Sequence, residues 1–194
     1  MPDAGTPPLT KRARTRARLL EAAVEVIREK GFYKTTLEDV ARRAGMTRGA
    51  IYGNFRHKDE LFLAVVETRW RPIAPLTHGA TVGEHLRRIG EAVVAAIPAR
   101  RAQALGALSF QLYALTHEDM RSRVARLNAE RYRREAARLR ERFPPGDLPM
   151  PPEQLVPVLH ALTDGLLALR LLQPEAITDA MIVGAFEALG KGPA

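Results

Sequence analysis

The sequence predicts an all-α protein of about nine helices, and three observations carry this prediction. Apolar residues recur every three or four positions over most of the chain, no segment alternates with period two over a useful length, and proline or glycine separates the periodic segments. The 194 residues contain no cysteine, which excludes disulfide scaffolds, cysteine-ligated metal sites and thiol nucleophiles.

The first third of the chain is predicted to form short helices, most of them capped by threonine. A threonine before a helix can accept a hydrogen bond from a free backbone N–H of the first turn. The predicted helices are 11–30 after Thr10, 37–44 after Thr36, 48–55 after Thr47, and a fourth from about Lys58 towards Trp70. Asp39, at the third position after Thr36, forms a capping box of the less usual kind. Residues 1–9 are polar and are expected to be disordered.

The rest of the chain is predicted to consist of long helices with short joints. Proline marks most joints because it lacks the backbone N–H that a helix interior needs. The predicted ranges are 82–97, 100–116, 118–142, 152–172 and 175–190.

Positive charge is concentrated at the N-terminus. Residues 1–58 hold 13 Lys and Arg against 6 Asp and Glu, whereas residues 59–194 hold 17 against 16. This asymmetry indicates a nucleic-acid-facing segment joined to a nearly neutral body. The longest uncharged stretch, 102–117, is shorter than the roughly 20 apolar residues of a membrane-spanning helix, and no signal peptide is apparent, so we expect a cytoplasmic protein with no membrane partner.

Residues 36–55 have the spacing of a helix-turn-helix motif. Ala41 lets the two helices cross closely, Gly45 makes the turn, and Ile51 packs the second helix on the first. The second helix can then present its N-terminal end to the major groove of DNA.

The residue types at that end suit DNA recognition. Thr47 and Arg48 offer hydrogen-bond donors, Gly49 permits close approach, and Tyr52 can reach a phosphate or a thymine methyl group. Lys58 can contact a phosphate. The basic run 11–18 can contact the DNA backbone near the edge of the groove. Two alternatives to DNA contact stay open: Tyr52 packs in the core, and the basic run is a solvated helix face.

The stretch from Leu19 to Glu67, which contains TTLEDVARRAGMTRGAIYGNF, resembles the N-terminal domain of TetR-family transcriptional regulators over about residues 12–66. The resemblance implies a homodimer with a DNA-binding domain over residues 10–56 and a ligand-binding, dimerising body over residues 57–194. It further implies a repressor that needs no cofactor and that a small-molecule ligand releases from a palindromic operator. Carried over by position, the expected DNA contacts are Thr36, Thr47, Arg48, Gly49, Tyr52 and Lys58.

Two positions depart from the family pattern. Gly53 stands where a larger polar or aromatic residue is frequent, and His57 stands where serine or asparagine often caps the next helix. Glycine also weakens a helix by up to about 1 kcal/mol relative to alanine. The base preference therefore stays open.

The last two predicted helices are candidates for a dimer interface. The segment 155–172 is apolar nearly all round, and such a helix must be covered on all sides. We expect a four-helix bundle between two subunits, the alternative being that one chain covers both helices. The predicted interface residues are Leu159, Leu162, Leu166, Leu169, Ile177, Met181 and Ala185.

A ligand pocket is predicted around helix 118–142. Asn128 falls within its apolar face and Arg131 lies at the margin, so each faces either a ligand or a neighbour such as Glu135. Each aromatic residue nearby is a core residue in the alternative reading. The candidate lining residues are Trp70, His85, Phe110, Gln111, Tyr113, His117, Asn128 and Arg131.

An enzyme is the main rival class, and the sequence argues against it. Neither serine, Ser109 or Ser122, lies in G-x-S-x-G, and the histidines form no H-E-x-x-H. We therefore expect no catalytic residue and no metal site. A ligand-independent DNA-binding protein and an activator remain alternatives within the same fold.

Overall fold

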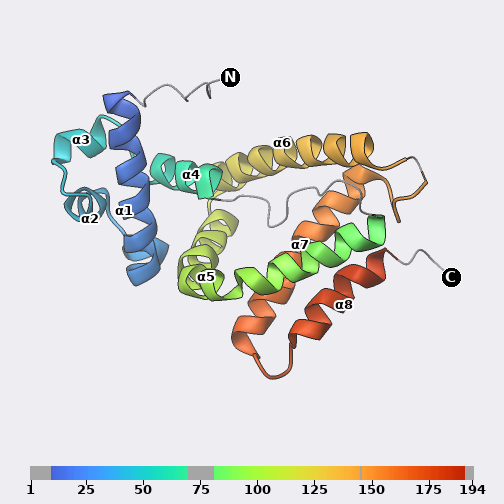
Figure 1. Cartoon of the computed structure of the whole chain (residues 1–194). Coiled ribbons are helices and arrows are strands. Elements are labelled where there is room, and N and C mark those ends of the chain that lie inside the picture. Colours follow the sequence, from blue (N-terminus) through green and yellow to red (C-terminus); the bar gives the residue numbers. More distant parts are fainter. Residues whose placement is uncertain (1–9, 70–80, 145, 191–194) are drawn as a thin grey trace, which may run out of the picture. The chain divides into compact units, whose positions relative to one another are not determined.

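The computed structural model describes residues 10–69, 81–144 and 146–190 (Figure 1). These residues form helices and no strand, which confirms the all-α prediction. The helices are α1 (Lys11–Lys34), α2 (Leu37–Arg43), α3 (Arg48–Tyr52), α4 (Lys58–Arg69), α5 (Val82–Thr116), α6 (Glu118–Arg142), α7 (Pro152–Leu172) and α8 (Asp179–Leu189). Inside α1, Gly31 has φ 72° and ψ 171°, outside the helical region, so α1 joins two helical segments at the glycine where the sequence predicts an end. Residues 1–9 and Trp70 lie outside the described residues.

The chain divides into two compact units. Unit 1 contains the described residues of Met1–Trp70 and Leu105–Met120, and unit 2 contains those of Arg71–Ala104 and Arg121–Ala194. The sequence places the domain boundary at residue 56, whereas α4 and the C-terminal part of α5 pack in unit 1. Aromatic burial is the reason, because Phe62 of α4 and Phe110 of α5 are buried beside Phe32, with ring centroids 3.8 and 5.8 Å from that of Phe32.

The core of unit 1 forms where α2 and α4 pack against α1 and α3 packs against α2. The spacing of apolar residues in α1 predicts a buried stripe of Leu20, Ala23, Val24 and Ile27, and three of these, Leu20, Ala23 and Ile27, are buried. Val24 is only partly buried, and Val26 is buried in addition. A helix such as α1 that packs against more than one neighbouring helix needs a wider apolar face than a single stripe.

Pro98 lies inside α5, although the sequence predicts a break between residues 97 and 100. A proline in a helix interior removes one backbone hydrogen bond and costs about 3 kcal/mol or more. Burial stabilises the helix on both sides of it, through Leu86 and Val93 before the proline and Phe110 and Ala114 after it. Packing therefore outweighs the local cost.

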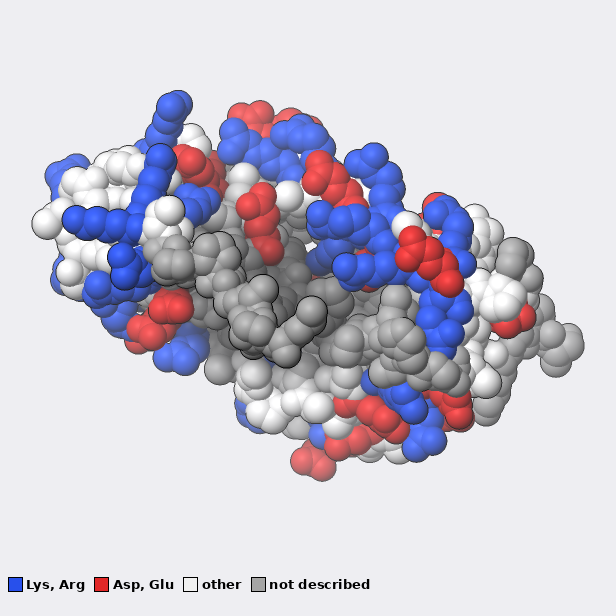
Figure 2. All heavy atoms as spheres, turned by 45° about the horizontal axis from the view of Figure 1, so that its top comes forward, with Lys and Arg blue, Asp and Glu red and all other residues white. Residues whose placement is uncertain are grey.

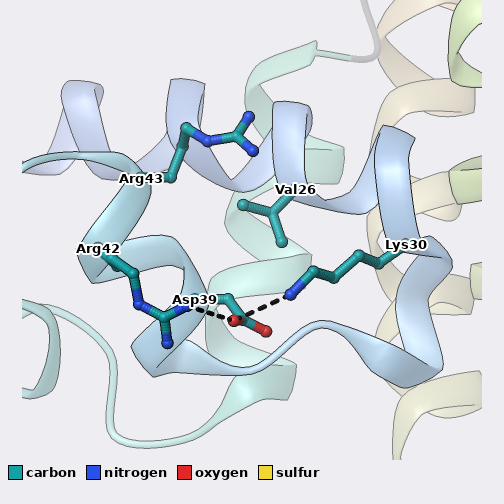
Figure 3. Close-up of a pocket in the computed structure, with 5 residues that line it drawn as sticks. All are labelled: Val26, Lys30, Asp39, Arg42 and Arg43. Atoms are coloured by element: carbon teal, nitrogen blue, oxygen red, sulfur yellow. Dashed lines mark ion pairs between the residues drawn. The ribbon is translucent and has the colours of Figure 1, made fainter.

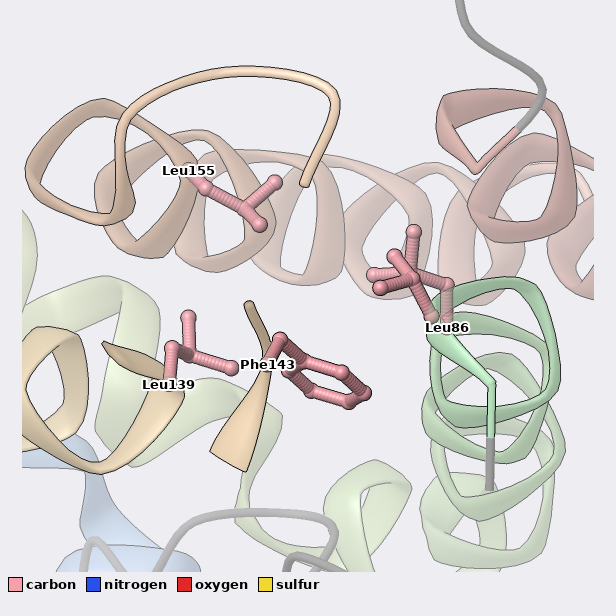
Figure 4. Close-up of a cluster of buried hydrophobic side chains, with 5 residues drawn as sticks. Leu86, Leu139, Phe143 and Leu155 are labelled. Atoms are coloured by element: carbon pink, nitrogen blue, oxygen red, sulfur yellow. The ribbon is translucent and has the colours of Figure 1, made fainter. Parts of the chain in front are cut away.

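Unit 2 has its core between α5, α6, α7 and α8. One buried cluster joins the N-terminal turns of α5, the end of α6 and the start of α7 (Figure 4). Its members are Val82, Leu86, Leu139, Phe143 and Leu155. A second cluster joins α5, α7 and α8 and consists of Val93, Leu167, Ile182 and Phe186. Each helix of unit 2 thus contributes an apolar face to a shared interior.

Helix α8 starts at Asp179 rather than near the predicted residue 175. Residues after Gln173 first form a turn, in which the backbone N–H groups of Ala176 and Ile177 both donate to the carbonyl of Gln173. The side chain of Thr178 then accepts from the backbone N–H of Met181 at 3.2 Å. The true N-cap is therefore Thr178.

Packing within unit 2 covers only part of the apolar surface of α7. Among the described residues, α7 is the one helix that is long and apolar enough to suit a membrane span, with 21 residues and a mean hydropathy of 1.6 over an 18-residue segment. Of that segment, 17% is buried in the structure. Leu155, Thr163 and Leu167 face the interior of unit 2. On its other side Leu169 and Leu172 are 43% and 73% exposed. This composition also suits a helix whose second face packs on a partner.

The close approach of α5 and α8 at Gly90 predicts a measurable loss of stability on substitution. A Cβ at Gly90 would lie 2.9 Å from the backbone Cα of Val183 and 3.3 Å from Phe186. Because a backbone atom cannot swing aside, Gly90→Ala must separate the two helices and should lower the free energy of unfolding by about 1–3 kcal/mol. Urea denaturation followed by circular dichroism measures this loss.

Gly83→Ala is the matched control on the same helix, because a Cβ there meets nothing within 4 Å. It should leave stability unchanged or raise it by up to about 1 kcal/mol. Equal losses in the two variants would contradict the close packing of α5 on α8.

Candidate nucleic-acid interface

The predicted capping box at the start of α2 is present. The side chain of Thr36 accepts from the backbone N–H of Asp39 at 3.1 Å, and Asp39 accepts from the backbone N–H of Thr36 at 3.3 Å. These bonds satisfy two backbone donors that a helix N-terminus leaves free. They also occupy the Thr36 hydroxyl, which the resemblance assigns to DNA contact.

Gly45 forms the turn between α2 and α3, as the sequence predicts. Its φ of 63° lies in the left-handed region, which favours glycine because it has no Cβ. The backbone N–H of Met46 donates to the carbonyl of Ala41 at 2.9 Å and closes the turn. Ala41 and Ile51 are both buried, so the two helices cross at the small residue and pack through the β-branched one.

Asp39 ties α2 to α1. Its carboxylate lies 3.0 Å from Nζ of Lys30 and 3.5 Å from the guanidinium of Arg42, beside a hollow of about 290 Å³ that Val26 and Arg43 also line (Figure 3). The hydrogen bond from Lys30 is the main cause that lowers the pKa of Asp39. These groups pair with each other, so they hold the two helices in register.

Helix α3 and its N-cap residue expose polar side chains at the surface. Thr47 caps the helix by accepting from the backbone N–H of Ala50 at 3.3 Å. Arg48 has a side chain that is 76% exposed, and Tyr52 is 39% exposed. A Cβ at Gly49 would meet only the Thr47 hydroxyl, at 3.9 Å, so a large partner can come close to the backbone there. The structure thus brings these four predicted residues together on the exposed surface of one short helix and its N-cap.

Glu38 of α2 belongs to this surface, although sequence reasoning did not find it. Its Oε1 accepts a hydrogen bond from the Tyr52 hydroxyl at 2.8 Å and lies 3.4 Å from a guanidinium nitrogen of Arg48. The guanidinium carbon of Arg48 lies 5.3 Å from the centre of the Tyr52 ring. The hydrogen bond from Tyr52 is the main cause that lowers the pKa of Glu38. Glu38 and Tyr52 are 14 residues apart, and no local pattern signals their contact.

Gly53 ends α3 as its C-cap. A Cβ at this position would lie 3.1 Å from the carbonyl oxygen of Gly49, which is a tight contact. A residue with a side chain would therefore be crowded at this position, so the glycine that departs from the family pattern relieves a close contact at the end of α3.

Lys58 is half-buried at the start of α4. Its Nζ donates to the carbonyl of Tyr33 at 3.0 Å and lies 4.3 Å from the centre of the Phe32 ring. Desolvation by this burial lowers the pKa of Lys58. The hydrogen bond to Tyr33 engages one of the three N–H donors of the ammonium group.

The basic run on α1 divides into two groups. Arg16 donates to the carbonyl of Asn54 at 3.3 Å and covers the Phe55 ring, and Arg18 donates to the carbonyl of Ala44 at 3.0 Å. These two hold the helix-turn-helix motif to α1. Lys11, Arg12 and Arg14 are exposed, and Figure 2 shows Lys and Arg side chains gathered over the N-terminal helices.

The candidate pocket residues are divided between the two units, and Trp70 lies outside the described residues. In unit 1, Phe110 is buried, and the Tyr113 hydroxyl donates to Asp59 at 3.1 Å. Gln111 and His117 are exposed, and the His117 ring stacks on that of Tyr113 at 3.8 Å between centroids. Within unit 1, Phe110 and Tyr113 thus belong to the aromatic core around Phe32.

In unit 2, His85 is only 4% exposed, and its ring lies 5.6 Å from that of Phe143. Burial is the main cause that lowers the pKa of His85, and the charge of Arg142 adds to the effect.

Arg131 belongs to a polar cluster on α6 and α7. Its guanidinium lies 3.1 Å from Nδ1 of His160, which also meets the Tyr132 hydroxyl, and Nε2 of His160 lies 3.2 Å from Asp164. Asn128 is half-buried on the same helix. Within the described residues, no group of three or more His, Cys, Asp or Glu side chains is placed to hold a metal ion.

The predicted interface residues differ in exposure. Leu169 and Met181 are 43% and 52% exposed. The others are partly buried, and among them Leu159, Leu162, Leu166 and Ile177 pack against the second core cluster of unit 2. Val158 and Leu172, which the prediction omits, are exposed on α7.

Comparison with known proteins adds the family. The sequence model described as "Bacterial regulatory proteins, tetR family" matches residues 19–65. The HTH-type transcriptional regulator SrpR of Pseudomonas putida is 41% identical over 83 residues, which cover 43% of this chain and 38% of SrpR. The chain thus aligns with well under two thirds of that relative.

Two solved structures extend the likeness over the whole chain. Salmonella enterica GusR has a TM-score of 0.71 at 20% identity, covering 94% of this chain and 98% of GusR, and so shares the fold. NalD, described as the secondary repressor of the MexAB-OprM multidrug efflux pump in Pseudomonas aeruginosa, has a TM-score of 0.57 at 27% identity, covering 94% of this chain and 98% of NalD. The match over residues 19–65, on a helix-turn-helix with this geometry, identifies the N-terminal domain of the chain as one of the type found in the TetR family of bacterial regulatory proteins.

Proposed function

We propose that this protein is a non-enzymatic transcriptional regulator that reads double-stranded DNA with α3. The observation that carries the proposal is the exposed surface of α3 and its N-cap, where Thr47, Arg48, Gly49 and Tyr52 are exposed while Ile51 is buried. A short helix held from behind can enter the major groove with its N-terminal residues against the base edges. The family match supports the same role, and regulation of transcription would take place in the cytoplasm.

Each exposed group has a defined task in this proposal. Arg48 binds a guanine in a bidentate manner, because its guanidinium can donate two parallel hydrogen bonds to O6 and N7. Tyr52 contacts a thymine methyl group or a phosphate. Lys58 and the exposed cations Lys11 and Arg12 neutralise phosphates, which gives affinity without sequence preference.

A second copy of the chain is the proposed partner of α7 and α8. Exposed apolar side chains on both helices support it: Val158, Leu169, Leu172 and Met181. A two-fold dimer carries two reading heads and should bind a palindrome with half-site centres about one duplex turn apart, or a modest extension of it.

Repression and release by a small molecule complete the proposal. NalD is described as a repressor, and its likeness to this chain extends over both units. In unit 2 a hollow of about 390 Å³ is lined in part by Val82, Arg142 and Phe143, beside the buried His85, and a hollow that combines apolar side chains with a few polar groups is the usual form of a small-molecule site. An activator, or a regulator without an effector, is the alternative within the same fold.

Arg48→Ala and Lys58→Met test DNA reading. The probes are a duplex selected from a random pool by the wild-type protein and a scrambled duplex of equal length. Arg48→Ala should weaken binding to the selected duplex by roughly 1–3 kcal/mol and relax the preference at one base pair per half-site. Lys58→Met keeps the aliphatic stem over Phe32 but removes the charge, so it should weaken both duplexes alike and reduce the salt slope by about one unit. Fluorescence anisotropy across a salt series measures both effects.

If Arg48→Ala weakens both duplexes equally, Arg48 contacts phosphate and the assignment to a base is wrong. If neither variant changes binding while circular dichroism shows native helicity, α3 is not the reading helix.

Leu169→Asp tests the dimer. Light scattering of the wild type should give about twice the chain mass of 21.5 kDa. Leu169→Asp should give a folded monomer, because an unpaired charge in a dry interface is strongly unfavourable. Leu166 is unsuitable for this test because it packs in the core of its own unit. Leu115→Asp on α5, where Leu115 is 68% exposed, is the control and should remain dimeric. A monomeric wild type at micromolar concentration would rule out the proposed interface.

Displacement of DNA by small molecules tests effector control. A panel of uncharged aromatic compounds is added to the complex with the selected duplex, and anisotropy reports release. A compound can release DNA only through its differential affinity for the two states of the protein. Leu127→Trp enlarges a half-buried side chain next to Asn128 on α6, so it should blunt the response without weakening DNA binding, and Leu115→Trp should respond as the wild type does. A response that survives Leu127→Trp unchanged would place the effector elsewhere.

A further inference from the structure

We propose that Glu38 is a specificity-determining residue that positions Arg48 and Tyr52 for base reading and disfavours binding to DNA of arbitrary sequence. This inference rests on the proposed function, since it concerns how α3 reads DNA.

One carboxylate oxygen connects the two reading residues. Oε1 of Glu38 lies 2.8 Å from the Tyr52 hydroxyl and 3.4 Å from a guanidinium nitrogen of Arg48. Arg48 and Tyr52 are four residues apart, so they lie on the same face of α3, and the guanidinium is 5.3 Å from the Tyr52 ring. Each of the three groups therefore contacts the other two.

Glu38 is presented from a fixed element. It lies in the first turn of α2, which the Thr36–Asp39 capping box begins and which the pair between Asp39 and Lys30 ties to α1. Glu38 itself has a side chain that is 42% exposed. The two neighbouring acids thus have different tasks: Asp39 holds α2 in place, and Glu38 reaches the reading helix.

The contact leaves Arg48 able to bind a base. An arginine carries five N–H donors, and the ion pair engages one nitrogen while the side chain stays 76% exposed. The remaining donors can fork onto guanine. A long side chain that is already held in one orientation loses less conformational entropy when it binds, so the correct base pair gains affinity.

The same carboxylate opposes binding to a wrong sequence. A negative charge at a surface that approaches phosphates is repelled on every duplex. On the correct sequence the contacts of Arg48 and Tyr52 offset this repulsion, whereas on an arbitrary sequence they do not. Glu38 should therefore lower affinity for every duplex through its charge and raise the ratio of specific to non-specific affinity through its positioning of Arg48 and Tyr52.

The test uses the full chain with the selected and scrambled duplexes. Glu38→Ala should weaken binding to the selected duplex and tighten binding to the scrambled one, so that the affinity ratio falls roughly 5–10-fold. Glu21→Gln is the control, because Glu21 is an exposed acid on α1 and its substitution also removes one negative charge. It should change the ratio by less than about twofold, since charge loss alone acts on both duplexes alike.

A double-mutant cycle shows whether Glu38 acts through Arg48. In an Arg48→Ala background, Glu38→Ala should cause a smaller fall in the ratio than in the wild type, because only its contact with Tyr52 is left to lose. A Glu38→Ala variant with the wild-type ratio, or an equal fall in both backgrounds, would overturn the inference. If Arg48→Ala alone leaves the ratio unchanged, base reading by Arg48 itself fails, which is a different result.

A spectroscopic readout separates positioning from simple loss of structure. The Tyr52 hydroxyl holds the pKa of the Glu38 carboxyl below its ordinary value, so Tyr52→Phe should raise that pKa in an NMR titration, and Arg48→Ala should raise it less. The sign follows from linkage: a contact to an ionised carboxylate exists above the ordinary pKa and is lost as pH falls through the lowered one. An unchanged titration in Tyr52→Phe would contradict the contact on which the inference depends.

Discussion

Burial of one side of two very short helices is the constraint on which the DNA-facing surface depends. α2 has seven residues and α3 has five, far fewer than the roughly 12–15 that an isolated helix needs to be stable in water. Val40, Ile51 and Phe55 are fully buried, and threonine caps close the first turns of both helices. The exposed side chains of α3 therefore take their positions from buried neighbours, and the rigidity of the surface is a property of the core.

Pairing decides which positive charges in unit 1 remain available for a partner. Arg43 binds Glu25 and Glu29, and Lys30 binds Asp39, so these pairs hold α1 and α2 together. Arg42 pairs with Asp39 within α2. Surface pairs of this kind contribute little to stability one by one, but they remove donors from the surface that approaches DNA. A count of charges along the chain finds the basic segment without showing this division.

In unit 2, the last two helices have apolar side chains that the single chain does not bury. These helices are apolar on two faces, and one face of each forms the core of the unit around Leu167, Ile182 and Phe186. The other face carries Leu169, Leu172 and Met181 and stays exposed in a single chain. Apolar area of this extent favours association, since contact removes it from water. The same helices thus stabilise the subunit and carry the apolar surface on which the proposed dimer depends.

Local rules determined much of this protein from the sequence alone. The caps at Thr10, Thr36 and Thr47 and the turn at Gly45 depend on neighbours within four residues, and all are present. The tertiary structure decided whether α5 continues through Pro98, which leucines of α7 face inward, and where Glu38 points. These outcomes depend on contacts between residues far apart in the sequence, where burial and pairing outweigh local preference, and a pattern of residue types does not contain them.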